Sequence, residues 1–180
     1  MWILLPLLFI TGVLTRIADM IADDGLKLNR YVSYATGIAY GFLIAYVIRT
    51  NPALAELGIA VILSVIITGK IDHPVHCLGV SSMLFFLAIY GINPLNPALL
   101  VIFILGAAAD ELGNNLADKK RIRGFFGHFF RLKLTMEAVA FLASAFTGLW
   151  IIFLAILIYD TGYTYIFTSG VRRRLLSIFR

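Results

Sequence analysis

Residues 95–120, LNPALLVIFILGAAADELGNNLADKK, indicate the fold class of this chain. The first half of the stretch is almost entirely apolar, and the whole is long enough to cross a bilayer as a helix, which takes about 20 residues. The last turns nevertheless carry polar side chains, among them Asp110, Glu111, Asn114 and Asp118. Acidic groups at membrane depth are costly, and by default they indicate a functional site. The stretch therefore predicts a membrane helix that ends in a polar site.

The composition of all 180 residues extends this conclusion to the rest of the chain. Hydrophobic residues make up 61% of the sequence, and the mean hydropathy is +0.93. The apolar residues come in runs, without the alternation of a membrane β-barrel. No polar stretch is long enough to fold as a separate soluble domain. We therefore expect one all-α domain over residues 1–180, a polytopic helical bundle in the cell membrane.

Six transmembrane helices are predicted from the apolar runs and the residues that interrupt them. Asn51-Pro52 and Asn93-Pro94 are expected to form turns between neighbouring spans. The last span is long, and the pair Thr147-Gly148 is expected to bend it; a division there into two short spans is the alternative. The predicted spans are residues 2–22, 31–49, 53–70, 75–92, 95–117 and 133–160.

The distribution of lysine and arginine predicts the orientation. Ten of the 15 basic residues follow the first, third and fifth spans, which places these turns in the cytoplasm and the amino terminus outside. The tail residues Arg172 to Arg174 conflict with this assignment, because they would lie outside unless the last span re-enters the membrane. The net charge of +5 is thus a topology signal and an attraction to anionic lipids, and it does not indicate nucleic-acid binding.

Polar residues gather at three helix ends on the predicted cytoplasmic side. Asp19 and Asp23 are four residues apart and so share one helix face. Glu111, Asn114 and Asp118 form a stripe on another helix. Carboxylates on two facing helices suit Mg²⁺, which takes oxygen ligands and is commonly shared with a substrate phosphate. The third group lies in the loop between them and consists of Lys70, Asp72, His73 and His76.

Each group also has a simpler interpretation. Asp19 and Asp23 are then solvated residues of a polar turn, and the two histidines pack at the membrane interface. Glu111 and Asp118 are then ion-pair partners of nearby cations, namely Lys119, Lys120 or Arg123.

The spacing of these acids resembles the two aspartate-rich motifs of the UbiA superfamily of intramembrane prenyltransferases, approximately NDxxDxxxD and DxxDxxxD. Asp19-x-x-x-Asp23 matches the last two positions of the first motif, and Asn29-Arg30 is similar to the segment that follows it in the family. The series from Glu111 through Asn114 and Asp118 to Lys119 resembles the second motif.

The chain also departs from the family pattern. Family members have about nine spans, so the resemblance covers their spans two to seven. Thr15 and Arg16 stand where the first motif has Asn and Asp. Asn114 replaces the central aspartate of the second motif, and Tyr31 replaces a proline.

The resemblance implies a Mg²⁺-dependent enzyme that transfers a prenyl group from an isoprenyl diphosphate, or performs related lipid-phosphate chemistry, on the cytoplasmic side. Membrane lipids and the lipid phosphate are the implied partners. The implied catalytic residues are Asp19, Asp23 and Asp118. The implied metal ligands are Asp19, Asp23, Glu111, Asn114 and Asp118, and the implied diphosphate contacts are Arg30, Lys70 and Lys119.

Two other functions fit the sequence. The chain would be a small cation or metal transporter if a polar path reached the opposite side, through hydroxyl residues such as Ser64 and Ser144 and through Glu137. Alternatively, it would be a non-catalytic membrane subunit, in which case association into a homo-oligomer would help to cover so small a bundle.

Overall fold

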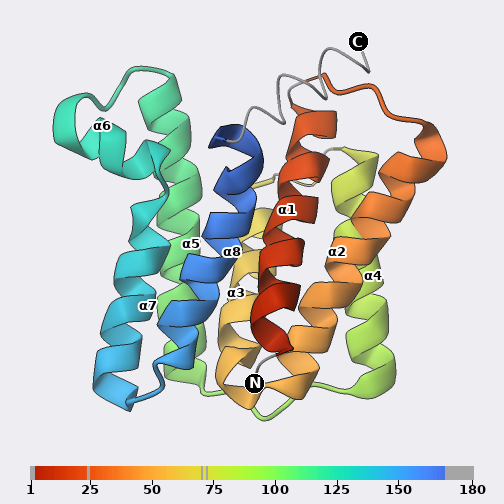
Figure 1. The fold of residues 1–180 in the computed structure, drawn as a ribbon. Coiled ribbons are helices and arrows are strands. Elements are labelled where there is room, and N and C mark those ends of the chain that lie inside the picture. Colours follow the sequence, from red (N-terminus) through yellow and green to blue (C-terminus); the bar gives the residue numbers. More distant parts are fainter. Residues whose placement is uncertain (1–2, 24, 70, 72, 169–180) are drawn as a thin grey trace. The chain divides into compact units, whose positions relative to one another are not determined.

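The computed structural model describes residues 3–23, 25–69, 71 and 73–168, apart from the side chains of Asp118, Phe167 and Thr168 (Figure 1). The described residues form helices and connecting segments without a strand, so the all-α prediction is confirmed. The helices are α1 (Leu4–Ala22), α2 (Arg30–Thr50), the 3-10 turn η1 (Pro52–Leu54), α3 (Ala55–Ile67), α4 (Pro74–Tyr90), α5 (Pro97–Asp118), α6 (Gly124–Arg131), α7 (Leu134–Thr147) and α8 (Ile151–Thr168).

Three of these helices are long and apolar enough to cross a membrane, by length and composition. They are α1, α2 and the part of α5 from Pro97 to Ala117. The remaining apolar helices are shorter, and they lie over Pro52–Ile67, Pro74–Tyr90, Leu134–Thr147 and Ile151–Ile166. A membrane protein is therefore indicated, and six crossings stay a prediction.

Several helices begin where a polar side chain precedes a proline. The Asn51 side chain accepts a hydrogen bond from the Ala53 N–H at 3.1 Å, which caps η1. Asn96 caps α5 in the same way, and His73 caps α4 through Nδ1. Proline is favoured at the first helical position because its missing N–H would have no partner there. The expected turn at Asn93-Pro94 lies in the segment between α4 and α5.

The last predicted span is two helices, so the expectation of a single bent span over residues 133–160 was wrong. α7 ends at Thr147, and Gly148 adopts a left-handed conformation with φ 74°. The Gly148 N–H donates to the Ser144 carbonyl at 2.8 Å. The Ser144 hydroxyl also accepts from the Phe153 N–H at 3.1 Å and donates to the Leu149 carbonyl, so it stabilises the turn into α8.

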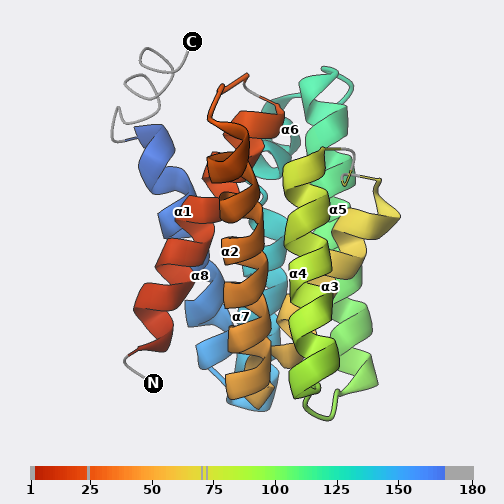
Figure 2. The ribbon, with the colours of Figure 1, turned by 90° about the vertical axis from the view of Figure 1, so that its right-hand side faces the viewer.

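The chain divides into two compact units, and α8 begins in one and ends in the other. The first unit spans Met1–Thr50, Ile71–Ile92 and Leu157–Arg180, and it contains α1, α2, α4 and the end of α8. α2 lies beside both α1 and α4 (Figure 2). Small residues allow these close contacts: a Cβ built on Gly41 would fall 2.0 Å from the Gly79 carbonyl oxygen, and one built on Gly12 of α1 would fall 2.0 Å from the Tyr159 carbonyl oxygen of α8.

The second unit spans Asn51–Lys70 and Asn93–Ile156, and it is built around α5. α3, α6 and α7 each pack on this helix. The buried Glu56 carboxylate accepts the Asn96 N–H at 2.7 Å, which ties the start of α3 to the start of α5. Toward the other end of α5, the ring of Phe130 covers Gly113 and holds α6 against the helix.

Candidate functional site

Asp19 is the centre of a polar cluster in the first unit. It lies in the last two turns of α1, and its side chain is 21% exposed. The Tyr163 hydroxyl from α8 donates a hydrogen bond to Oδ2 at 2.5 Å. His76, in the first turn of α4, places Nε2 at 3.5 Å from Oδ1. The helices α1, α4 and α8 therefore each contribute one polar side chain to this cluster.

Arg16 supplies a positive charge one turn before Asp19. Its Nη1 donates to the Tyr163 hydroxyl at 3.3 Å, and its guanidinium carbon lies 5.3 Å from the centroid of the Tyr163 ring. The Tyr163 hydroxyl thus accepts from a cation and donates to a carboxylate. Such charge-assisted hydrogen bonds are stronger than neutral ones, and they fix the orientation of the side chains.

Tyr40 of α2 extends the cluster beyond His76. Its hydroxyl lies 3.4 Å from Nδ1 of His76 and 3.4 Å from the His76 carbonyl oxygen. The phenol reaches this position because its ring lies against Gly79, one turn further along α4. The cluster consists of Arg16, Asp19, Tyr40, His76 and Tyr163, and it is called the Asp19 cluster below.

The other predicted residues of the first unit lie nearer the solvent. Asp23 is exposed at the carboxyl end of α1, and its N–H donates to the Asp19 carbonyl. Arg30 is exposed at the start of α2, where Nε donates to the Tyr34 hydroxyl at 2.9 Å. Lys70 lies outside the described residues. The helix face shared by Asp19 and Asp23 therefore combines a half-buried carboxylate with an exposed one.

Acidic residues of α5 interact with the start of α7 in the second unit. The Lys133 ammonium lies 2.7 Å from Glu111 Oε1, so Glu111 has a basic partner, although not one of the three cations expected from the sequence. The buried Asp110 accepts the Thr135 N–H at Oδ1, 3.0 Å, and the Met136 N–H at Oδ2, 2.8 Å. Asp110 therefore caps α7, since the first N–H groups of a helix have no partner within it.

The remaining predicted residues of α5 lie at its carboxyl end. Asn114 is half-buried, and Lys119 is exposed at the end of the helix. The Asp118 side chain lies outside the described part of the chain. Among the described side chains, no group of three or more His, Cys, Asp or Glu could hold a metal ion.

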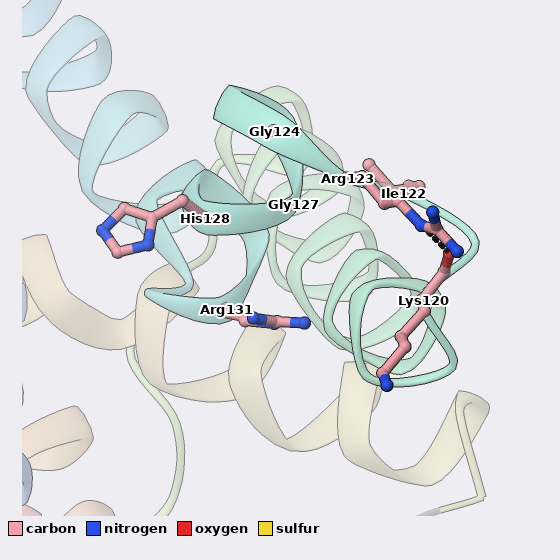
Figure 3. Close-up of a pocket in the computed structure, with 7 residues that line it drawn as sticks. All are labelled: Lys120, Ile122, Arg123, Gly124, Gly127, His128 and Arg131. Carbon is pink, nitrogen blue, oxygen red and sulfur yellow. Dashed lines mark hydrogen bonds between the residues drawn. The ribbon is translucent and has the colours of Figure 1, made fainter.

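A basic pocket lies at the carboxyl end of α5. It has a volume of about 350 Å³, and it is lined by Lys120, Arg123, His128 and Arg131, by Ile122 and by the backbone at Gly124 and Gly127. Figure 3 shows the Arg131 guanidinium directed toward the turn that carries Lys120 and Arg123, while the His128 ring extends away from that turn. This cavity is called the α6 pocket below.

Sequence reasoning missed Tyr40, Tyr163 and the α6 pocket. Tyr163 was interpreted as a residue of the membrane interface, Tyr40 was given no role, and residues 118–132 were taken as a connecting turn. The one available signal was the pattern GFFGHFFR at 124–131, in which aromatic and basic residues alternate with glycine. Comparison with protein-family models, curated proteins and solved structures found no match.

Proposed function

We propose that the chain is an integral membrane enzyme that acts on a lipid phosphate, with prenyl transfer from an isoprenyl diphosphate as the reaction to test first. The supporting observation is the Asp19 cluster. A carboxylate within a membrane-length helix is costly, so by default it indicates a functional site. Asp19 is held by Tyr163 and faces His76, so it is oriented by groups on two other helices. Groups held in this way suit binding and catalysis, because little reorganisation is needed during reaction.

A cation accompanies Asp19, as a phosphate-bearing substrate requires. Arg16 lies one turn from Asp19 and donates to the Tyr163 hydroxyl that holds the carboxylate. Guanidinium groups bind phosphate oxygens through paired hydrogen bonds. The apolar helices would cover the hydrocarbon part of the substrate.

The hydroxyl groups named in the transporter hypothesis donate to main-chain carbonyls of their own helix, of a neighbouring helix or of the turn after α7. These contacts do not favour a path for an ion over a structural role. The contacts are Ser64 to Val61, Thr68 to Ser64, Ser82 to Ile38, Ser144 to Leu149 and Thr147 to Ala143.

Mg²⁺ is the cofactor expected from the sequence. Asp19 and Asp23 would be the first carboxylates to test as ligands, together with Glu111, Asn114 and Asp118. When bound, the ion would neutralise negative charge on the departing diphosphate. Arg16 and Tyr163 would orient the Asp19 carboxylate whether or not the ion is present.

We propose a topology with seven crossings, because two helices replace the last predicted span. If each apolar helix crosses once, the chain leaves α8 on the side where α1 ends. The four tail arginines then join the ten basic residues assigned to the cytoplasm, and Arg49 alone remains on the other side. This distribution satisfies the positive-inside rule better than six spans do.

The experiment measures diphosphate release from an isoprenyl diphosphate by the purified protein in nanodiscs, with Mg²⁺ or with a chelator. We expect Asp19→Asn to lower turnover by about a hundred-fold or more, the size of loss seen when a preorganised electrostatic group is removed. Asp110→Asn is the matched control: it should lower the melting temperature while the turnover of the folded protein is retained. Full activity of Asp19→Asn would exclude the proposal, and a constant stoichiometric protein partner without turnover would favour the non-catalytic subunit.

A further inference from the structure

The α6 pocket has the charge and position of a binding site for a phosphorylated lipid headgroup. It combines three cationic side chains from two segments, the Lys120–Arg123 turn and the end of α6. The segment from Lys119 to Met136 contains no Asp or Glu in the sequence. A cavity of about 350 Å³ lies at the lower end of the size range of small-molecule sites.

Two of the three cations, Arg123 and Arg131, have main-chain contacts. Arg131 donates from Nη2 to the Ala117 carbonyl at 3.1 Å, and Arg123 donates from Nε to the Lys120 carbonyl at 3.2 Å (Figure 3). A guanidinium has five N–H donors, so one such bond leaves donors available for an anion. Because one bond already restricts each guanidinium, these two side chains lose less conformational entropy when a ligand binds.

The backbone adds a further attraction for anions. Arg123 is the N-cap of α6, and no side chain forms a cap hydrogen bond there. The first turn of α6 lines the pocket at Gly124 and Gly127, and of these two the Gly127 N–H already donates to the Arg123 carbonyl at 3.4 Å. Free N–H groups and the positive end of the helix dipole favour a negative charge at such a place.

Aromatic residues of α6 indicate that the anion belongs to a lipid. Phe125 and Phe126 are 76% and 63% exposed, and their rings pack edge to face. Phe130 faces the other way and covers Gly113 of α5. Exposed aromatic residues beside basic ones, at the end of a membrane-length helix, are typical of segments that lie in the headgroup region. A soluble phosphate compound would not need this apolar surface.

We propose that the α6 pocket binds the phosphomonoester headgroup of an anionic membrane lipid through Lys120, Arg123 and Arg131, while Phe125 and Phe126 contact its acyl chains. A phosphomonoester carries nearly two negative charges and presents three acceptor oxygens, which suits two guanidiniums and one ammonium. This binding does not depend on the reaction proposed for Asp19.

The test uses the purified full chain in detergent and measures Kd for three probes: a short-chain phosphatidic acid, the matching phosphatidylcholine and inorganic phosphate. We expect the phosphatidic acid to bind at least about ten-fold more tightly than either of the others, which corresponds to about 1.4 kcal/mol. The double variant Arg123→Gln/Arg131→Gln should weaken this binding by about ten-fold or more. Lys119→Gln/Arg121→Gln is the matched control, because it removes the same charge from exposed residues that do not line the pocket.

Two results would overturn the proposal. Equal weakening by the pocket variant and the control would show a general attraction of the basic segment. Equal affinity for inorganic phosphate and for the lipid would show a site for a soluble anion. Because Arg131 also contacts the end of α5, Lys120→Asn is measured as a second variant; asparagine tolerates the left-handed backbone of this residue. Phe125→Ser/Phe126→Ser should weaken lipid binding and leave phosphate binding unchanged.

Discussion

The Tyr40 ring lies against the backbone of Gly79, and this contact allows the phenol to reach His76. A Cβ built on Gly79 would fall 2.0 Å from Cζ of the ring, and the Tyr40 hydroxyl lies 3.4 Å from His76 Nδ1. The position of His76 opposite Asp19 thus depends on Gly79, which lies one turn away on α4 and has no side chain to displace the Tyr40 ring.

Gly79→Ala should therefore displace Tyr40 and destabilise the first unit. An added methyl group in a well-packed contact typically costs about 1–3 kcal/mol. The measurement is thermal unfolding in detergent. Ser81→Ala, at an exposed position of the same helix, is the control and should leave the melting temperature nearly unchanged. Equal stability of the two variants would show that Tyr40 does not need this contact.

Tyr163→Phe should also destabilise the Asp19 cluster, because the cluster loses the hydrogen bonds of the Tyr163 hydroxyl. The change removes the donor to Asp19 and the acceptor of Arg16, and both groups are half-buried. The loss of a hydrogen bond to a charged group amounts to about 1.5–3 kcal/mol. Tyr31→Phe, at a residue that is 81% exposed, is the control. If both variants unfold at the wild-type temperature, the hydroxyl of Tyr163 has no structural role.

The Glu111–Lys133 pair should show a modest coupling energy in a double-mutant cycle of Glu111→Gln and Lys133→Met. The pair is close at 2.7 Å, but the Lys133 side chain is 39% exposed, so solvent screens the attraction. We expect about 0.5–1 kcal/mol from unfolding measurements. A cycle that pairs Glu111→Gln with Lys119→Met should give a smaller value. A coupling of zero would mean that the contact contributes nothing to stability.

Gly113→Ala should move α6 and thereby weaken binding at the α6 pocket. A Cβ at this position would fall 2.2 Å from Cδ1 of Phe130, so the ring and its helix would have to shift. We expect weaker binding of the short-chain phosphatidic acid, with the exposed Leu112→Ala as the control. Unchanged affinity in Gly113→Ala would show that the pocket does not depend on the position of α6.

Reporter fusions test the proposed topology. Fusions at the two ends of the chain should place the carboxyl terminus in the cytoplasm and the amino terminus outside, because α7 and α8 are separate helices. If the reporters place both termini on the same side, the number of crossings is even and the proposed seven crossings are wrong.

The sequence predicted the helices better than the contacts between them. Apolar runs and the prolines at residues 52 and 74 located most helix ends, since these signals are local. The turn at Gly148 was underestimated, because apolar residues continue on both sides of it. The partners of Asp19 were not predictable, since Tyr163 lies 144 positions away and no local pattern links the two. Asp110 and Glu111 were recognised as unusual, but their bonds to α7 depend on how that helix packs.

The left-handed turn at Gly148 has a consequence for the length of the structure. A continuous helix over residues 134–168 would measure about 50 Å at 1.5 Å per residue, whereas the hydrocarbon core is about 30 Å thick. The chain turns back at Gly148, so the length that exceeds the hydrocarbon core lies in a second helix, α8. If α7 and α8 each cross the membrane, as proposed above, the turn at this glycine adds one crossing and so reverses the face on which α8 ends.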